Sequence, residues 1–146
     1  MAGKRIASLA ALGGSAERPR PNYRWEAPRA PLTIESMTQT PSQRITAEVT
    51  SWPGVEAGPG RRGEFAFRVG RKEIGHLHGD HAAHFGFPKD VWAELFEQDR
   101  VTYHPVFPGK PGFGARRIVD DADVEDVIAM MRLNYDRITA ARRDAA

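Results

Sequence analysis

The sequence contains no cysteine among its 146 residues, and this absence excludes several kinds of site. Disulfides, thiolate-bound zinc, iron–sulfur clusters and a cysteine nucleophile all require a residue that this chain lacks. A chain without disulfides is typical of a reducing compartment, so we expect a cytoplasmic protein.

Long apolar runs and a strong charge of one sign are also missing. No stretch of about 18 apolar residues occurs, so we expect no membrane-spanning segment and no membrane partner. The apolar stretch at 6–12 is too short and too rich in small residues for a secretion signal. The formal net charge of +2 is too weak to indicate nucleic acid as a partner.

Residues 1–39 differ in composition from the rest of the chain. Proline removes a backbone donor and disfavours helix at the residue before it. Four prolines fall among the basic residues of this segment: Pro19, Pro21, Pro28 and Pro31. We predict an extended or disordered Arg/Pro-rich tail, in which Tyr23 and Trp25 are candidates for docking a protein partner.

Residues 40–146 are long enough for a single domain of ordinary size. Capping signals and apolar residues at helical spacing predict helices over 41–51, 88–98 and 120–142. Alternating or β-branched segments predict strands over 55–58, 64–69, 72–78, 82–87, 101–106 and 115–119. The order helix, strands, helix, strands, helix indicates an α+β fold, with three helices packed on an antiparallel sheet of five to six strands.

Histidine is concentrated in the segment 70–88, which holds four of the five histidines: His76, His78, His81 and His84. His76 and His78 are two apart on a predicted strand, so their side chains share one face. With His104 from a later strand they can bind a metal, and Asp80 can be a fourth ligand or orient a ring. The same imidazoles can also do acid–base work near neutral pH. We expect His81 and His84 to be solvated.

The sequence pattern does not decide whether these histidines line a pocket or face solvent. Strict alternation puts Ile74 on the face of His76 and His78, and Leu77 on the opposite face. The histidines therefore either line a partly apolar pocket or lie on the solvent face. Candidate walls for such a pocket are Phe65, Phe67, Phe107 and Tyr135.

The same histidines also match a known zinc-binding motif. Residues 76–81 match the HxHxDH motif of metallo-β-lactamase-fold hydrolases. That fold needs two halves of sheet and helix and further metal ligands well downstream, and the chain after Asp80 is too short for them. We therefore set this motif aside, because a motif without its structural context is weak.

A broader set of motifs extends from about residue 40 to residue 139. It consists of Trp52-Pro53-Gly54-Val55, the segment 73–80 (EIGHLHGD), Phe87-Pro88, Tyr103-His104, Asp123-Val124 and Arg132-Leu133-Asn134-Tyr135. In these motifs the chain resembles the luciferase-domain family, small proteins that share a domain with the fungal luciferase. The sequence departs from the family's pattern at Phe113 and at Gly114-Ala115.

The resemblance implies a protein that binds or transforms a conjugated small molecule. The fungal enzyme oxidises a polyphenolic pyrone with molecular oxygen and without a metal or organic cofactor, so no cofactor is expected here. By analogy, His76, His78 and His104 deprotonate an enol or phenol, and Asp80 holds a ring in its tautomer. The enolate would be stabilised by Arg117 and Arg132.

Whether the chain is an enzyme at all is not decided by these patterns. The alternative is a non-enzymatic interaction module that binds a protein through its tail. A nucleic-acid version would use the basic hairpin, with Arg61, Arg62, Arg68, Arg71 and Lys72 on one face.

Overall fold

The computed structural model describes residues 38–145. The predicted tail and its docking residues Tyr23 and Trp25 lie outside the described residues, apart from Thr38 and Gln39. Within the described part, no helix combines the length and the apolar character needed to cross a membrane.

Three helices and six strands make up the described fold, and they confirm the predicted α+β class. In chain order they are α3 (Pro41–Thr50), β1 (Val55–Pro59), β2 (Phe65–Val69), β3 (Lys72–His78), β4 (Ala82–Gly86), α4 (Lys89–Glu97), β5 (Thr102–Tyr103), β6 (Phe113–Arg117) and α5 (Asp121–Ala145). A capping box between Thr40 and Gln43 begins α3, as the sequence predicts.

The last two strands differ from their predicted bounds. β5 holds only two residues, whereas the sequence predicted a strand over 101–106, and β6 begins at Phe113 instead of Ala115. Prolines at 105, 108 and 111 remove backbone donors from the segment between them, which therefore forms a loop. β6 starts early because Phe113 pairs with Gly86 of β4.

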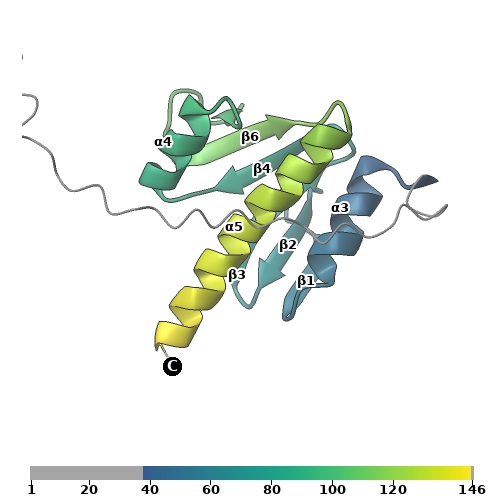
Figure 1. Cartoon of the computed structure of the whole chain (residues 1–146), viewed down its shortest axis with the longest axis vertical. Coiled ribbons are helices and arrows are strands. Elements are labelled where there is room, and N and C mark those ends of the chain that lie inside the picture. Colours follow the sequence, from purple (N-terminus) through teal and green to yellow (C-terminus); the bar gives the residue numbers. More distant parts are fainter. Residues whose placement is uncertain (1–37, 146) are drawn as a thin grey trace, which may run out of the picture.

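All six strands form one antiparallel sheet in the order β1-β2-β3-β4-β6-β5. β6 lies between β4 and β5, which places the loop of residues 104–112 at this side of the sheet. Figure 1 shows α3 and α5 on the same face of the sheet, with α5 crossing the strands diagonally. α4 joins this face, because a Cβ added at Gly114 would meet Trp92 of α4 at 3.6 Å.

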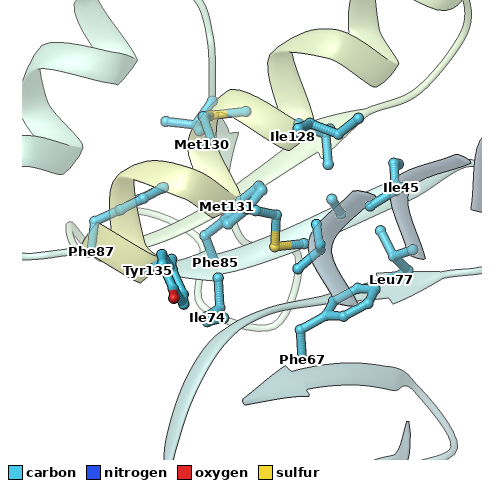
Figure 2. Close-up of a cluster of buried hydrophobic side chains, with 14 of the residues drawn as sticks. Ile45, Phe67, Ile74, Leu77, Phe85, Phe87, Ile128, Met130, Met131 and Tyr135 are labelled. Carbon is cyan, nitrogen blue, oxygen red and sulfur yellow. The ribbon is translucent and has the colours of Figure 1, made fainter. Parts of the chain in front are cut away.

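The hydrophobic core fills the space between the sheet and these helices. Figure 2 shows side chains from β2, β3, β4, α3 and α5 meeting there, among them Ile45, Phe67, Leu77, Phe85 and Met131. Phe67 and Met131 are fully buried. The helix-facing side of the sheet therefore supplies the stability of the fold and leaves the other side free for polar groups.

A β-bulge in β3 separates the core from the histidines. Phe67 pairs with Gly75 and Arg68 pairs with Glu73, so Ile74 is an extra residue without a partner in β2. Ile74 is 0% exposed and lies in the core (Figure 2). The expectation from strict alternation, that Ile74 shares the face of His76 and His78, is therefore wrong.

A buried side chain of α5 stabilises the bulge through hydrogen bonds. Nδ2 of Asn134 donates hydrogen bonds to the carbonyl oxygens of Ile74, at 3.0 Å, and of Gly86, at 2.9 Å. Asn134 is fully buried. Its amide thereby joins the bulge of β3 to the end of β4, which favours this register of the two strands.

Candidate functional site

Four histidines gather on the sheet face that is opposite the helices. His76 of β3 pairs directly with His84 of β4, and His78 lies two residues further along β3. The ring centroids of His76, His78 and His84 are 5.1, 5.2 and 4.3 Å apart in their three pairs. His104, directly after β5, places its ring centroid 4.2 Å from that of His84. We call these four residues the histidine cluster.

His84 is the buried centre of the histidine cluster, and the expectation that it is solvated is wrong. It is only 8% exposed, because β3 and β6 flank its strand and the ring of His104 lies against it. Burial, together with the neighbouring His104, His78 and His76, lowers the pKa of His84 to about 4. Its Nδ1 has no hydrogen-bond partner among the residues that the structure describes.

His76 is held by a carboxylate. Its Nδ1 lies 3.1 Å from Oε2 of Glu73, and an ionised carboxylate can only accept a hydrogen bond. Nδ1 therefore carries the proton, and in the neutral ring Nε2 keeps its lone pair. Glu73 thus fills the orienting role that the sequence assigned to Asp80. Spacing alone did not reveal it, because the bulge changes which residues of β3 are close.

Asp80 instead holds the beginning of α3. Its Oδ1 accepts a hydrogen bond from the backbone N–H of Ser42 at 2.9 Å. Hydrogen bonds from the side chain and backbone of Ser42 lower the pKa of Asp80. The structure therefore places this carboxylate at the cap of α3 and not among the rings of the histidine cluster.

His104 has the opposite tautomer to His76. Its Nδ1 accepts a hydrogen bond from the backbone N–H of Val106 at 3.1 Å, so the proton of the neutral ring is on Nε2. Burial and the charges of His76, His78 and Arg62 lower the pKa of His104. The neutral ring therefore offers an N–H donor at Nε2 and no lone pair there.

Aromatic side chains border the histidine cluster on the side of His104. The ring centroids of Phe107 and Phe113 lie 5.3 and 6.4 Å from that of His104, and 4.7 Å from each other. Nζ of Lys110 lies within 5.5 Å of both phenylalanine ring centroids. Phe107 was expected as a wall residue. Phe113 was not, because its place depends on the pairing of β6 with β4.

The other expected wall residues lie on the helix side of the sheet. Phe67 and Tyr135 belong to the core, and the hydroxyl of Tyr135 donates to the carbonyl of Pro53 at 2.7 Å. Phe65 lines a separate apolar depression of about 430 Å³ beside α3. These three residues are therefore not brought together with the histidine cluster, although the first two stabilise the sheet that carries it.

The two expected arginines occupy different places. Arg132 of α5 lies over the rings of Trp52 and Tyr135, at 5.1 and 4.9 Å from their centroids, and its Nε is 3.0 Å from Asp136. Arg117 is exposed on β6 opposite Ala82, which puts it on the histidine side of the sheet. Only Arg117 is therefore placed to face a ligand at the histidine cluster.

Glu64 and Arg62 border the histidine cluster from the turn between β1 and β2. Oε2 of Glu64 accepts the backbone N–H of Arg62 at 3.0 Å. Hydrogen bonds from its own backbone and from Arg62, with the charges of His76 and His78, lower the pKa of Glu64. Sequence spacing did not reveal these two residues, because they approach the histidines only through the pairing of β2 with β3.

A comparison with protein families supports the resemblance seen in the sequence. The family model of the luciferase domain matches residues 71–134, a segment that runs from the start of β3 into α5. This match confirms the similarity to the luciferase-domain family, and it contains all four residues of the histidine cluster. Neither the curated proteins nor the solved structures provide a match to the chain.

Proposed function

We propose that this luciferase-domain-like protein binds and transforms an acidic, conjugated small molecule, an enol or a phenol, at the histidine cluster. One observation carries the proposal. Four imidazoles meet on one sheet face, and hydrogen bonds fix complementary tautomers in two of them, His76 and His104. A proton acceptor and a proton donor thus lie in one cluster.

His76 is the proposed base. Its hydrogen bond to Glu73 leaves Nε2 free to accept a proton and stabilises the imidazolium that then forms. Removal of the O–H proton turns an enol or phenol into an electron-rich anion. Glu73 is a positioning residue in this scheme, because it acts through His76.

His104 and two arginines are proposed to stabilise that anion. The Nε2–H of His104 can donate to the negatively charged oxygen, because its Nδ1 is already occupied by the N–H of Val106. Arg117 brings positive charge to the same side of the sheet, and the charge of Arg62 acts on His104. Phe107 and Phe113 supply flat apolar surface on which a conjugated ring can stack.

The family resemblance suggests a reaction of the anion with molecular oxygen. Oxygen adds to a ring carbon of the anion, which forms a carbon–oxygen bond and reduces the oxygen to a peroxide. The imidazolium of His76 returns its proton to the peroxide, so the substrate and one O₂ combine into a hydroperoxide. No further oxidant or reductant is required for this step.

A nucleic-acid function is favoured less by the placement of the basic residues. Arg61 and Arg62 precede β2, whereas Arg71 and Lys72 follow it. The five residues of β2 separate the two pairs by roughly 17 Å, at ~3.3 Å per residue. Four of the five basic side chains are thus divided between the two ends of β2, and only Arg68 lies within the strand.

A spectroscopic titration tests the proposal. We would titrate the full chain with a nitrophenol and with a 4-hydroxy-2-pyrone, and follow the absorption band of each anion. Binding should raise the anion fraction at a pH below the pKa of the free probe. His76→Gln should weaken this effect by about tenfold or more, because the base is lost, and Glu73→Gln by less.

The control for this titration is His81→Ala, which removes an exposed histidine outside the histidine cluster. It should behave like the unchanged protein. If neither probe gives a saturable change, or if His76→Gln and His81→Ala give the same change as the unchanged protein, the proposal is wrong.

A further inference from the structure

We infer that His76, His78 and His84 form a binding site for a divalent transition-metal ion. Each ring offers one nitrogen, and these three nitrogens all lie within 4.8 Å of one another. In a tetrahedral site with metal–nitrogen bonds of about 2.05 Å, the nitrogens lie about 3.3 Å apart. Small rotations of the rings that bring the nitrogens closer by up to about 1.5 Å would therefore close the site around an ion.

The positions of the three ligands come from the pairing of two neighbouring strands. His76 and His84 face each other across β3 and β4, and His78 follows His76 on the same face. Asn134 hydrogen-bonds the carbonyl groups of Ile74 and Gly86, one in each strand. The backbone of the site is thus fixed before an ion arrives, so binding costs little ordering of the chain.

Two hydrogen-bonding observations point to an ion. The buried Nδ1 of His84 has no partner among the described residues, and buried polar atoms are rarely left in this state. The Nδ1–H of His76 faces Glu73, which is the arrangement in which carboxylates orient metal-binding histidines. A bound metal would be a partner for the ring of His84. It would also bind the lone pair on Nε2 of His76, which is free because Nδ1 carries the proton.

His104 is not part of the ligand set, although the sequence suggested it. Its Nδ1 accepts the N–H of Val106, and its Nε2 carries the proton, so neither nitrogen has a free lone pair. Three protein ligands with a further position open to a small molecule are typical of catalytic rather than structural metal sites. The His104 N–H would lie next to that open position.

The donor set defines the class of ion. Three imidazoles without a thiolate suit zinc, iron(II), cobalt(II), nickel or copper, whereas magnesium and calcium prefer oxygen ligands. A bound ion would occupy the Nε2 lone pair of His76, so His76 could be the base only in the metal-free protein. In the metal-bound protein the ion would take over this role and acidify the oxygen of an enol or phenol. That last role rests on the proposed function, whereas binding of the ion does not.

The experiment uses the full chain, purified without a histidine tag and freed of metal with a chelator. We would titrate it with Zn²⁺ by calorimetry, and with Co²⁺ by visible absorption, which reports coordination directly. The expected result is one ion per chain. His78→Ala should weaken binding at least 100-fold, and Glu73→Gln should weaken it about 10- to 100-fold.

Two control variants keep the inference falsifiable. His81→Ala removes an exposed histidine three residues beyond His78, and His104→Phe removes the ring that is excluded from the ligand set. Both should bind Zn²⁺ with unchanged stoichiometry. The inference is overturned if the unchanged protein binds no stoichiometric ion, or if His81→Ala weakens binding as much as His78→Ala does.

The metal titration and the probe titration can reject the metal site and the proposed function separately. Absence of metal binding with a normal phenol response would reject the metal site and leave the proposed function standing. One bound ion without any response to a phenol or enol would support the metal site and reject the proposed substrate class.

Discussion

At the scale of single residues, the separation of core and histidines depends on the bulge at Ile74. Because Ile74 is extra in β3, both Ile74 and Gly75 face the helices, and His76 starts the alternation of the other face. A strand without the bulge would have to place either Ile74 in solvent or His76 in the core, and each choice costs free energy.

Gly75→Ala should destabilise the protein at this point. A Cβ at residue 75 would meet Sδ of Met131 at 2.8 Å and Cδ1 of Phe85 at 3.0 Å. Overpacking of this kind costs about 1–3 kcal/mol of unfolding free energy. Urea denaturation would measure it.

The matched control is Gly58→Ala in β1, where an added Cβ meets nothing within 4 Å. That variant should change the unfolding free energy by less than about 0.5 kcal/mol. Equal stability of Gly75→Ala and the unchanged protein would show that this part of the bulge is not closely packed against Met131.

Asp80→Ala should lower stability without changing binding at the histidine cluster. Its carboxylate accepts the N–H of Ser42 at the beginning of α3, and loss of such a cap costs about 1 kcal/mol. The phenol titration and the zinc titration should both be unchanged. If the Asp80→Ala protein folds but no longer responds to phenol or to zinc, Asp80 orients a histidine ring, as the sequence suggested.

At the scale of elements, α5 is anchored where it begins. Asp123 Oδ2 accepts the backbone N–H of Val119 at 2.8 Å and that of Asp120 at 3.2 Å, and its Oδ1 accepts from Arg116 at 2.7 Å. The N–H of Asp123 donates in return to Oδ1 of Asp120 at 2.9 Å. This reciprocal pair is a capping box that ties α5 to the end of β6.

Asp123→Asn should therefore lower stability in a pH-dependent way. The hydrogen bond from Val119, followed by those from Asp120 and Arg116, holds the pKa of Asp123 below its ordinary value. The carboxylate thus stabilises the fold above its unfolded pKa, and this contribution is lost as the pH falls through the lower folded pKa. Urea denaturation should show a difference of about 1 kcal/mol at neutral pH, and this difference should shrink as the pH falls below the ordinary pKa range of an aspartate. A difference that stays constant with pH would contradict this account of the anchor.

The elements were predictable to the extent that they depend on local patterns. The capping box at Thr40 and Gln43 places α3, and the alternation of residues 64–69 places β2. The shortness of β5 and the early start of β6 were not predictable, because both depend on pairing with residues far away in the sequence. The bulge at Ile74 was missed for a related reason, since packing against α5 overrides strict alternation there.

At the scale of the whole molecule, one face of the sheet packs against the hydrophobic core and the other face carries the histidine cluster. Figure 1 shows α3 and α5 on one face of the sheet, and α4 packs on the same face. The pairing of β3 with β4 places the histidine cluster on the other face. The sequence pointed to His76 and His78 from their spacing, and to His104 from its place on a later predicted strand and from the family resemblance. It did not reveal the burial of His84, because that depends on β6 lying between β4 and β5. Glu73 and Phe113 were missed because their nearness to the histidines arises only in the folded sheet.

We propose that the histidine cluster, and not the apolar depression beside α3, is the functional site. The most direct measurement is an NMR titration of the labelled full chain with the nitrophenol and the pyrone. We expect saturable shifts of the ring signals of His76, His84 and His104, and no shift of the ring signals of His81. Shifts confined to Ala47 and Phe65 of the apolar depression, or an absence of shifts in the histidine rings, would contradict it.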